Sequence, residues 1–343
     1  MDLLKRLSEV AGIPGREERV RELIENELAG VVDEFHTDAM GNLHAIKHGK
    51  TADAKKVMIA AHMDEIGFVV KFIDENGFMR VQPVGGFDAR NLFARQVTVH
   101  ASRSGEDLFG VMNPGGKPIH ISTPEERSKV PGMELFFVDV GLSGDEVQEK
   151  VRIGDMITLR QEFMEFGELA TGKALDDRAS VWVLMRTLQE LKDSPFAVHG
   201  VFTTQEEVGL RGAITSSYIV EPDYAIALDV TLALDVPDVP AHQAVSKLGG
   251  GVGLKVMDSA SISTRWLLDH FIGLAESENI AHQMEVLPLG GTDAGPMQRA
   301  RGGAPTVTLS IPTRYIHSVT ETIHKQDLSA TKEILLAFLH NGL

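Results

Sequence analysis

Residues 57–64, VMIAAHMD, join an uninterrupted apolar run to two side chains that can bind a metal ion. The run VMIAA is too short for a helix and predicts a strand that is buried on both faces. Strands of this kind occur in parallel sheets that helices cover on both sides. In an open α/β sheet, functional side chains gather beyond the carboxyl ends of the strands. His62 and Asp64 therefore stand where a functional site is expected.

Three more predicted strands and one predicted helix carry similar side chains at their ends. They are Glu206 and Glu207 after a strand at 196–204, Asp229 after 224–228, His317 after 306–311, and Asp176 with Asp177 where a helix at 177–192 begins. Isolated carboxylates in one crevice would repel each other and resist desolvation. A pair of divalent cations removes this difficulty, and mixed histidine and carboxylate ligands suit zinc, cobalt or manganese.

Each of these features also has an ordinary explanation when it is taken alone. Asp176 and Asp177 could cap a helix and interact favourably with its dipole. Glu206 and Glu207 could belong to a solvated loop, and His317 could be a surface histidine. The coincidence of such groups at four strand ends favours a metal centre over four separate explanations.

The composition excludes several other classes of protein. The formal charge is −16, from 49 acidic and 33 basic residues, whereas a nucleic-acid-binding protein needs a basic face. No apolar stretch is long enough to span a bilayer, and the start of the chain predicts an amphipathic surface helix rather than a signal peptide. The chain has no cysteine, so a metal site must use histidine and carboxylate ligands. We expect a cytoplasmic protein without membrane or nucleic-acid partners.

The segment 70–165 differs in character from the rest of the chain. It contains short β-type runs such as RQVTVHA (95–101), separated by turn sequences such as DENG (74–77). Only one brief helix is predicted there, near 145–151. The segment is therefore expected to form a β-rich domain of its own.

Helices and strands alternate on both sides of this segment. Two further helices are predicted at 264–278 and 327–341. With 343 residues, the chain is long enough for two domains with separate cores. We expect one α/β domain formed by residues 1–69 and 166–343, with the β-rich domain at 70–165 inserted in it.

Six motifs together resemble the M42 family of metallo-aminopeptidases, which includes the tetrahedral and glutamyl aminopeptidases. They are AAHMDEIGF, KALDDR, TTQEEVGLRGA, ALDV, GGTDAG and RYIHS. Their order and separations match over nearly the whole chain. The resemblance implies a three-layer α/β/α metallopeptidase catalytic domain with an inserted β-rich domain, PDZ-like or barrel-shaped, that serves dimerisation.

The resemblance also implies a role for each site residue. Two divalent metal ions per subunit, zinc or cobalt, would share a bridging hydroxide. Asp176 would bridge the two ions, Glu207 and His317 would complete the ligands of one, and His62 and Asp229 those of the other. Glu206 would be the general base, Asp64 would orient the His62 ring, and a cis peptide would join Asp176 to Asp177.

The implied activity is hydrolysis of N-terminal residues from short peptides with a free amino terminus. The family resemblance also implies a homo-oligomer in which dimers build a dodecamer. Two alternatives remain open, an endoglucanase-like glycoside hydrolase and a non-catalytic metal-binding scaffold. A glycoside hydrolase needs two carboxylates that face each other across a sugar, which gives no reason for His62, Asp229 and His317.

Overall fold

The computed structural model describes residues 1–343 and divides them into two compact units. Unit 1 comprises Met1–Glu65, Phe163–Ile316 and Thr320–Leu343, and unit 2 comprises Ile66–Glu162 and His317–Val319. The expected mixed α/β fold class is confirmed. No helix is both long enough and apolar enough to cross a membrane.

Unit 1 is built on a sheet of 11 strands. Its central strands β12 (Ala197–Thr203), β3 (Lys56–His62), β13 (Tyr224–Leu232) and β16 (Thr306–Arg314) are parallel neighbours in that order. Their carboxyl ends therefore lie at one edge of the sheet. The other strands are β1 (Glu34–Thr37), β2 (Leu43–Lys47), β10 (Met164–Phe166), β11 (Leu169–Gly172), β14 (Val252–Met257), β15 (His282–Val286) and β17 (Glu321–His324).

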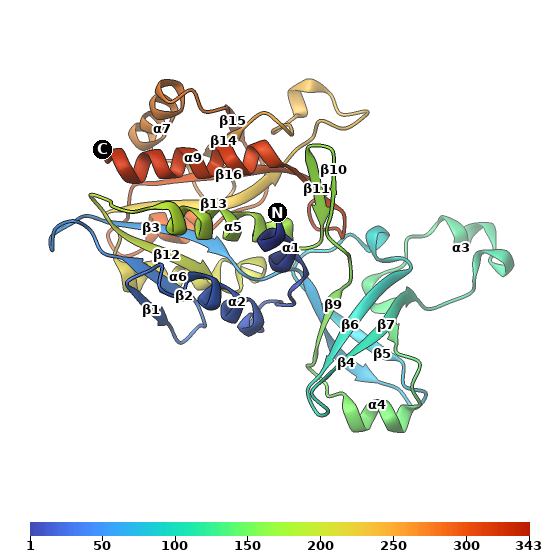
Figure 1. Ribbon diagram of the computed structural model, residues 1–343. Helices are drawn as coiled ribbons and strands as arrows, with labels where there is room; N and C mark the ends of the chain where they lie inside the picture. Colours follow the sequence, from blue (N-terminus) through green and yellow to red (C-terminus); the bar gives the residue numbers. More distant parts are fainter. The chain divides into compact units, whose positions relative to one another are not determined.

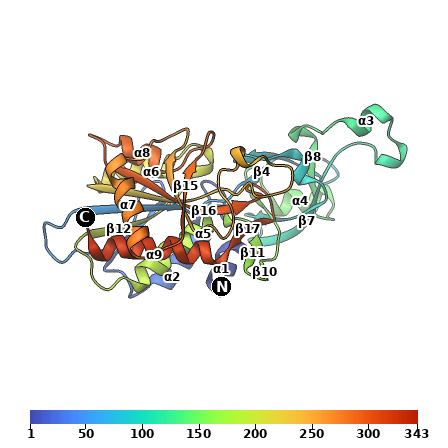
Figure 2. The same cartoon turned by 90° about the horizontal axis from the view of Figure 1, so that it is seen from above.

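Helices cover both faces of this sheet, as the alternation of side chains along β3 requires. Val57 and Ile59 belong to one apolar core, and Met58 and Ala60 belong to another on the opposite face. The first core includes residues of α5 and α9, which run along the sheet in Figure 1. The second includes residues of α6 and α8, on the other side from α9 in Figure 2. Unit 1 thus has three layers.

The helices of unit 1 differ in how much of their surface is buried. Those at the outside, such as α1, bury one apolar stripe, whereas α5 is buried over most of its surface. The sequence VWVLM within α5 is apolar all round, which suits a helix packed between other elements. The helices are α1 (Asp2–Glu9), α2 (Glu18–Leu28), α5 (Leu175–Glu190), α6 (Arg211–Val220), α7 (Arg265–Ser277), α8 (Ala294–Arg299) and α9 (Lys325–Asn341).

Unit 2 is a closed barrel with the strand order β4-β5-β8-β7-β6-β9. Alternate side chains such as Val97 and Val99 fill its interior. The strands are β4 (Gly67–Ile73), β5 (Met79–Val84), β6 (Arg95–Ala101), β7 (Glu106–Pro114), β8 (Phe136–Asp139) and β9 (Met156–Leu159). The short helix α4 (Gly144–Lys150) lies at the position predicted for the brief helix.

The prediction of a single helical piece in this region was incomplete. A second helix, α3 (Pro124–Ser128), begins with a capping box in which Thr123 and Glu126 satisfy each other's backbone N–H groups. The spacing Thr-x-x-Glu is a recognisable helix start, but no apolar stripe follows it. Periodicity therefore missed a helix whose residues are all exposed or half-buried.

The central strand β13 is longer than predicted. The apolar run 224–228 predicts a strand that ends at Leu228, yet β13 continues through Asp229 to Leu232. The β-branched residues Val230 and Thr231 pair with β16 and extend the ladder past the aspartate. Asp229 therefore lies within its strand, not after it.

Candidate metal centre and active site

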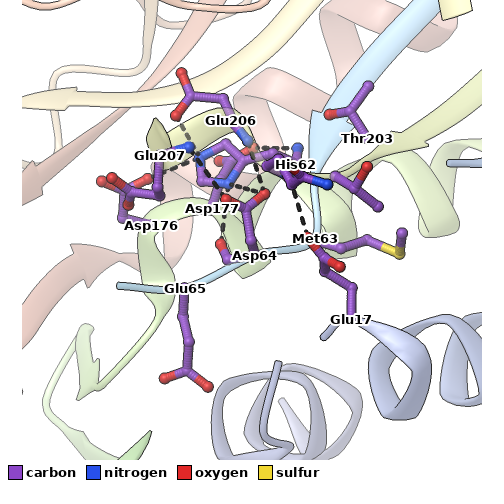
Figure 3. Close-up of polar contacts among 12 residues, drawn as sticks. Glu17, His62, Met63, Asp64, Glu65, Asp176, Asp177, Thr203, Glu206 and Glu207 are labelled. Atoms are coloured by element: carbon purple, nitrogen blue, oxygen red, sulfur yellow. Dashed lines mark hydrogen bonds and ion pairs between the residues drawn. The ribbon is translucent and has the colours of Figure 1, made fainter. Parts of the chain in front are cut away.

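His62, the last residue of β3, stands at the centre of the site (Figure 3). It is 2% exposed. Its Nδ1 lies 3.0 Å from the carbonyl oxygen of Asp64, and its Nε2 lies 3.1 Å from Oδ1 of Asp176. A carbonyl oxygen can only accept a hydrogen bond, so Nδ1 donates and the neutral ring leaves Nε2 as the nitrogen that can bind a metal ion.

Asp64 uses its carboxylate to hold the turn that follows β12. Its Oδ1 accepts a hydrogen bond from the backbone N–H of Glu206 at 3.0 Å, and Oδ2 accepts from that of Glu207 at 3.1 Å. The same carboxylate lies 3.6 Å from Nδ1 of His62. Asp64 thus contacts the His62 ring mainly through its backbone carbonyl and organises the two glutamates through its side chain.

The cis peptide bond between Asp176 and Asp177 is present at the start of α5. Neither aspartate has helical dihedral angles, so the regular helix begins at Arg178. Oδ2 of Asp177 accepts a hydrogen bond from the backbone N–H of His62 at 3.2 Å, and Glu321 accepts one from that of Asp176 at 3.0 Å. This arrangement brings the beginning of α5 to the end of β3.

Three overlapping groups of side chains could each hold a metal ion. Within each group the ligand atoms lie within 4.8 Å of one another. The groups are His62, Glu206 and Asp229; His62, Asp176 and Glu207; and Asp176, Asp177 and Asp229. Four of the five ligands expected from the sequence, His62, Asp176, Glu207 and Asp229, are therefore close together.

His317, the fifth expected ligand, is not in these groups. It belongs to unit 2, whereas the other four belong to unit 1. Its backbone has a positive φ of 61°. A β-carbon added to Gly86 would lie 3.2 Å from its Nδ1, so the ring packs closely against that glycine.

The charges of the cluster favour bound cations. Burial raises the pKa of Asp177, Glu206 and Asp229 well above the usual carboxylate range, and neighbouring carboxylates raise it further. Burial alone would lower the pKa of His62, but Glu206, Asp176 and Asp64 outweigh it and raise that pKa. Imidazole and carboxylate donors suit divalent transition metals, whose charge would let these groups remain deprotonated. The residues present therefore fit a metal centre.

Comparison with known proteins agrees with this chemistry. The family model described as M42 glutamyl aminopeptidase matches residues 41–334. This chain belongs to the M42 peptidase family. Its activity is that of an aminopeptidase, a hydrolase.

Individual M42 relatives and solved structures resemble the chain over almost its full length. A putative aminopeptidase of Acetivibrio thermocellus is 37% identical over 98% of this chain and 97% of its own. The lysyl aminopeptidase of Pyrococcus furiosus is 34% identical over 98% of this chain and 96% of its own. Among solved structures, an aminopeptidase of the archaeon Desulfurococcus kamchatkensis has a TM-score of 0.94 and 36% identity, covering 99% of this chain and 94% of its own. The Pyrococcus horikoshii TET1 peptidase has a TM-score of 0.87 and 32% identity, covering 99% of both chains.

The M42 site also contains buried charged residues that the sequence did not single out. Glu65 points away from His62 in Figure 3, and both of its carboxylate oxygens accept hydrogen bonds from Lys173 at 2.7 Å. Asp293 belongs to the motif GGTDAG but received no role. Its Oδ2 accepts a hydrogen bond from Thr203 at 2.6 Å, and burial raises its pKa to about 6. Its place in that motif was the one available signal.

Glu17 is a further buried carboxylate near this site, and the sequence offered no sign of it. A glutamate beside the start of a helix is ordinarily solvated and interacts with the helix dipole. The side chain of Glu17 is instead 3% exposed. Burial, followed by the charge of Asp64, raises its pKa to about 7.

The stability of the metal-free M42 protein should fall as the pH rises. A carboxylate whose pKa is higher in the folded than in the unfolded protein opposes folding increasingly above its unfolded value of about 4. The pKa values of Glu206 and Asp229 are raised in this way, and the raised pKa of Asp293 adds to the loss of stability up to pH about 6. His62 also contributes less stability as the pH rises. Its protonated ring stabilises the folded state fully below the pKa of histidine in the unfolded chain, and this stabilisation is lost as the pH rises through the higher pKa of the folded state.

The melting temperature at pH 6 and pH 8, with and without a chelator, measures this effect. We expect the chelated protein to lose more stability between the two values, because metal ions bind the deprotonated ligands. Metal at about 100 times its dissociation constant would add about 2.7 kcal/mol. If the melting temperature fell equally between pH 6 and pH 8 with and without the chelator, the electrostatic description of the cluster would be contradicted.

Proposed function

We propose that this M42 aminopeptidase hydrolyses short peptides at the amino end with two divalent cations bound per subunit. The observation that supports this most is the position of Asp176, the carboxylate that shares one ligand group with Glu207 and another with Asp229. A carboxylate has two oxygens and can contact two cations at once. His62, Asp229 and Glu207 would complete the set in unit 1, and the sequence motif RYIHS adds His317 to the proposal.

The two adjacent glutamates would have different roles. Two divalent cations bound at this position would supply a nucleophile at neutral pH and stabilise the charge that develops on the carbonyl oxygen. Glu207 would serve as a ligand, which makes its carboxylate a poor carrier of protons. Glu206, whose Oε2 lies 3.9 Å from Nε2 of His62, would accept the proton of the attacking water and deliver it to the departing nitrogen.

The acidic cluster also offers a reason for selection of the amino end. The free α-amine of a peptide is positively charged or becomes a nitrogen ligand when it loses its proton. Buried carboxylates favour the charged form, and a cation favours the neutral form by binding its nitrogen. A blocked amino terminus would lose this interaction, which makes exopeptidase activity the natural outcome of the site.

Zinc or cobalt, a cytoplasmic location and a homo-oligomeric state complete the proposal. The histidine and carboxylate ligands suit either metal. The Pyrococcus horikoshii TET1 peptidase can assemble into a tetrahedron or a large octahedral shell, and a solved structure of PhTET1-12s holds a dodecamer. Both support a homo-oligomer here, which we propose to be a dodecamer built from dimers. Gel filtration with light scattering measures the assembly directly.

A chelation experiment tests the function. The protein is treated with EDTA, dialysed and assayed on a panel of aminoacyl-p-nitroanilides after zinc, cobalt or no metal is returned. We expect activity to disappear with EDTA, to return with metal and to be absent on N-acetylated substrates. A glycoside hydrolase would cleave a β-glucan after chelation, and a non-catalytic scaffold would bind metal without cleaving any substrate of the panel.

A further inference from the structure

Glu17 directly precedes α2, yet its side chain does not cap that helix. It turns instead toward the loop that carries the two glutamates of the site. Its Oε1 accepts hydrogen bonds from the backbone N–H groups of Gly15 at 2.8 Å and Gln205 at 3.1 Å. Gln205 is the residue immediately before Glu206. One carboxylate oxygen therefore joins the start of the chain to the turn after β12.

This contact completes a series of three backbone hydrogen bonds. Glu17 accepts from Gln205, and the two oxygens of Asp64 accept from Glu206 and Glu207. Figure 3 shows both carboxylates near this turn. Three successive N–H groups are thus held by two buried side chains, and both side chains lie outside the proposed set of metal ligands. The backbone position of Glu206 and Glu207 depends on these contacts.

The backbone at Gln205 needs such support because its conformation is strained. Its φ is +56° and its ψ is 35°, in the left-handed region that costs a side-chain-bearing residue about 1–2 kcal/mol. Strained residues of this kind persist only where their surroundings enforce them. Glu17 holds the N–H of Gln205, and the N–H of Arg211 donates to its carbonyl oxygen at 3.2 Å. The turn is therefore fixed on both sides of the strained residue.

Glu17 follows a segment of backbone that Arg178 holds by hydrogen bonds. The guanidinium of Arg178 is fully buried and donates to the carbonyl oxygens of Leu7, Val10 and Gly12. Its Nε also donates to the carbonyl oxygen of Met63 at 2.6 Å, between His62 and Asp64. The segment before α2 is thereby fixed to the metal-binding end of β3. A hydrogen bond from this segment can define the position of the turn at Gln205.

We propose that Glu17 is a positioning residue, which holds the backbone at Gln205 so that the adjacent Glu206 is presented correctly to the metal centre. This inference rests on the proposed role of Glu206. Glu17 acts through a hydrogen bond and touches neither metal nor substrate. A neutral acceptor of the same shape should therefore replace it.

Two substitutions at this position separate the hydrogen bond from the charge. Glu17→Ala removes the acceptor, and we expect kcat to fall about 10- to 100-fold because small displacements of catalytic groups cost this much. KM should change by less than about 3-fold, since substrate binding is not the step affected. Glu17→Gln keeps an oxygen that can accept both N–H groups, and its kcat should stay within about 3-fold of the original. Glu18→Ala, at the exposed neighbouring position, is the matched control and should leave kcat unchanged.

Two measurements besides activity complete the test. Metal content should stay the same in all three variants, and the melting temperature reports whether Glu17→Ala is folded. Hydrogen exchange followed by mass spectrometry should show faster exchange in a peptide covering residues 204–208 for Glu17→Ala and normal exchange for Glu17→Gln. Faster exchange together with a lower kcat is the signature of a positioning residue.

Several outcomes would overturn the inference. Unchanged kcat in Glu17→Ala would show that the hydrogen bond is not needed, and equal losses in Glu17→Ala and Glu17→Gln would show that the charge is what matters. A loss of kcat that follows a loss of folded protein or of metal would assign Glu17 a structural role only. A wild-type protein without metal-dependent activity, or an active Glu206→Gln variant, would instead contradict the proposed function.

Discussion

Glu206→Gln is expected to lower kcat by about 10²–10⁴-fold, because a general base contributes a factor of this size. Glutamine has nearly the same shape but cannot take a proton from the attacking water. Its amide can still occupy the space beside His62, so the fold and KM should change little. Stopped assays on the preferred aminoacyl-p-nitroanilide, with metal supplied in excess, measure the loss.

Metal content distinguishes the role of Glu206 from that of its neighbour. Glu206 lies in one possible ligand group with His62 and Asp229, so it could itself contact a cation. If it is the base alone, Glu206→Gln should retain both ions, whereas Glu207→Gln should lose affinity for one. Loss of an ion from the Glu206 variant, measured by plasma mass spectrometry after dialysis, would reassign this glutamate as a ligand.

The parts of the fold that could be predicted are those that local patterns encode. The run at 57–61 is apolar on both faces of a strand, and β3 is indeed covered by helices on both sides. The run at 95–101 corresponds to β6 of the barrel. Closure of that barrel depends on pairing between strands far apart in sequence, such as β4 with β9. No local pattern specifies such pairing.

The same distinction holds within the site. Strand ends and a helix start pointed to His62, Asp176 and Glu207 because the polar residues directly follow or precede patterned segments. The backbone contact of Glu17 with Gln205 spans 188 positions. Its donor is a backbone N–H group, which every residue except proline possesses. A contact of this kind requires no particular residue type or spacing at the donor, so only the folded structure reveals it.

Asp229 lies in a setting that the sequence did not predict. The apolar run 224–228 predicts a strand that ends before this aspartate, but β13 passes through it. Its carboxylate is buried, and burial with the charge of Asp176 raises its pKa. A strand can hold such a group in its interior if a cation compensates the charge. The longer strand thus agrees with a bound metal ion better than with a solvated loop.

The largest effect on metal binding is expected from Asp176→Ala. Asp176 is the carboxylate common to the group with His62 and Glu207 and the group with Asp177 and Asp229. Removing a ligand shared by the two proposed cations should weaken the binding of both, so the metal content should fall from the proposed two ions per subunit toward none. Activity should fall by at least about 10³-fold, the equivalent of about 4 kcal/mol of transition-state stabilisation.

Asp229→Ala is the matched comparison for this variant, since it removes one buried carboxylate of the same size from the same cluster. Under the proposed ligand assignment it contacts one cation only, so about one ion per subunit should remain. Titration of the metal-free variants with zinc, followed by calorimetry, gives both stoichiometries and affinities. Equal stoichiometry in the two variants would contradict the bridging role of Asp176. Removing a ligand shared by two ions must release more metal than removing a ligand of one ion.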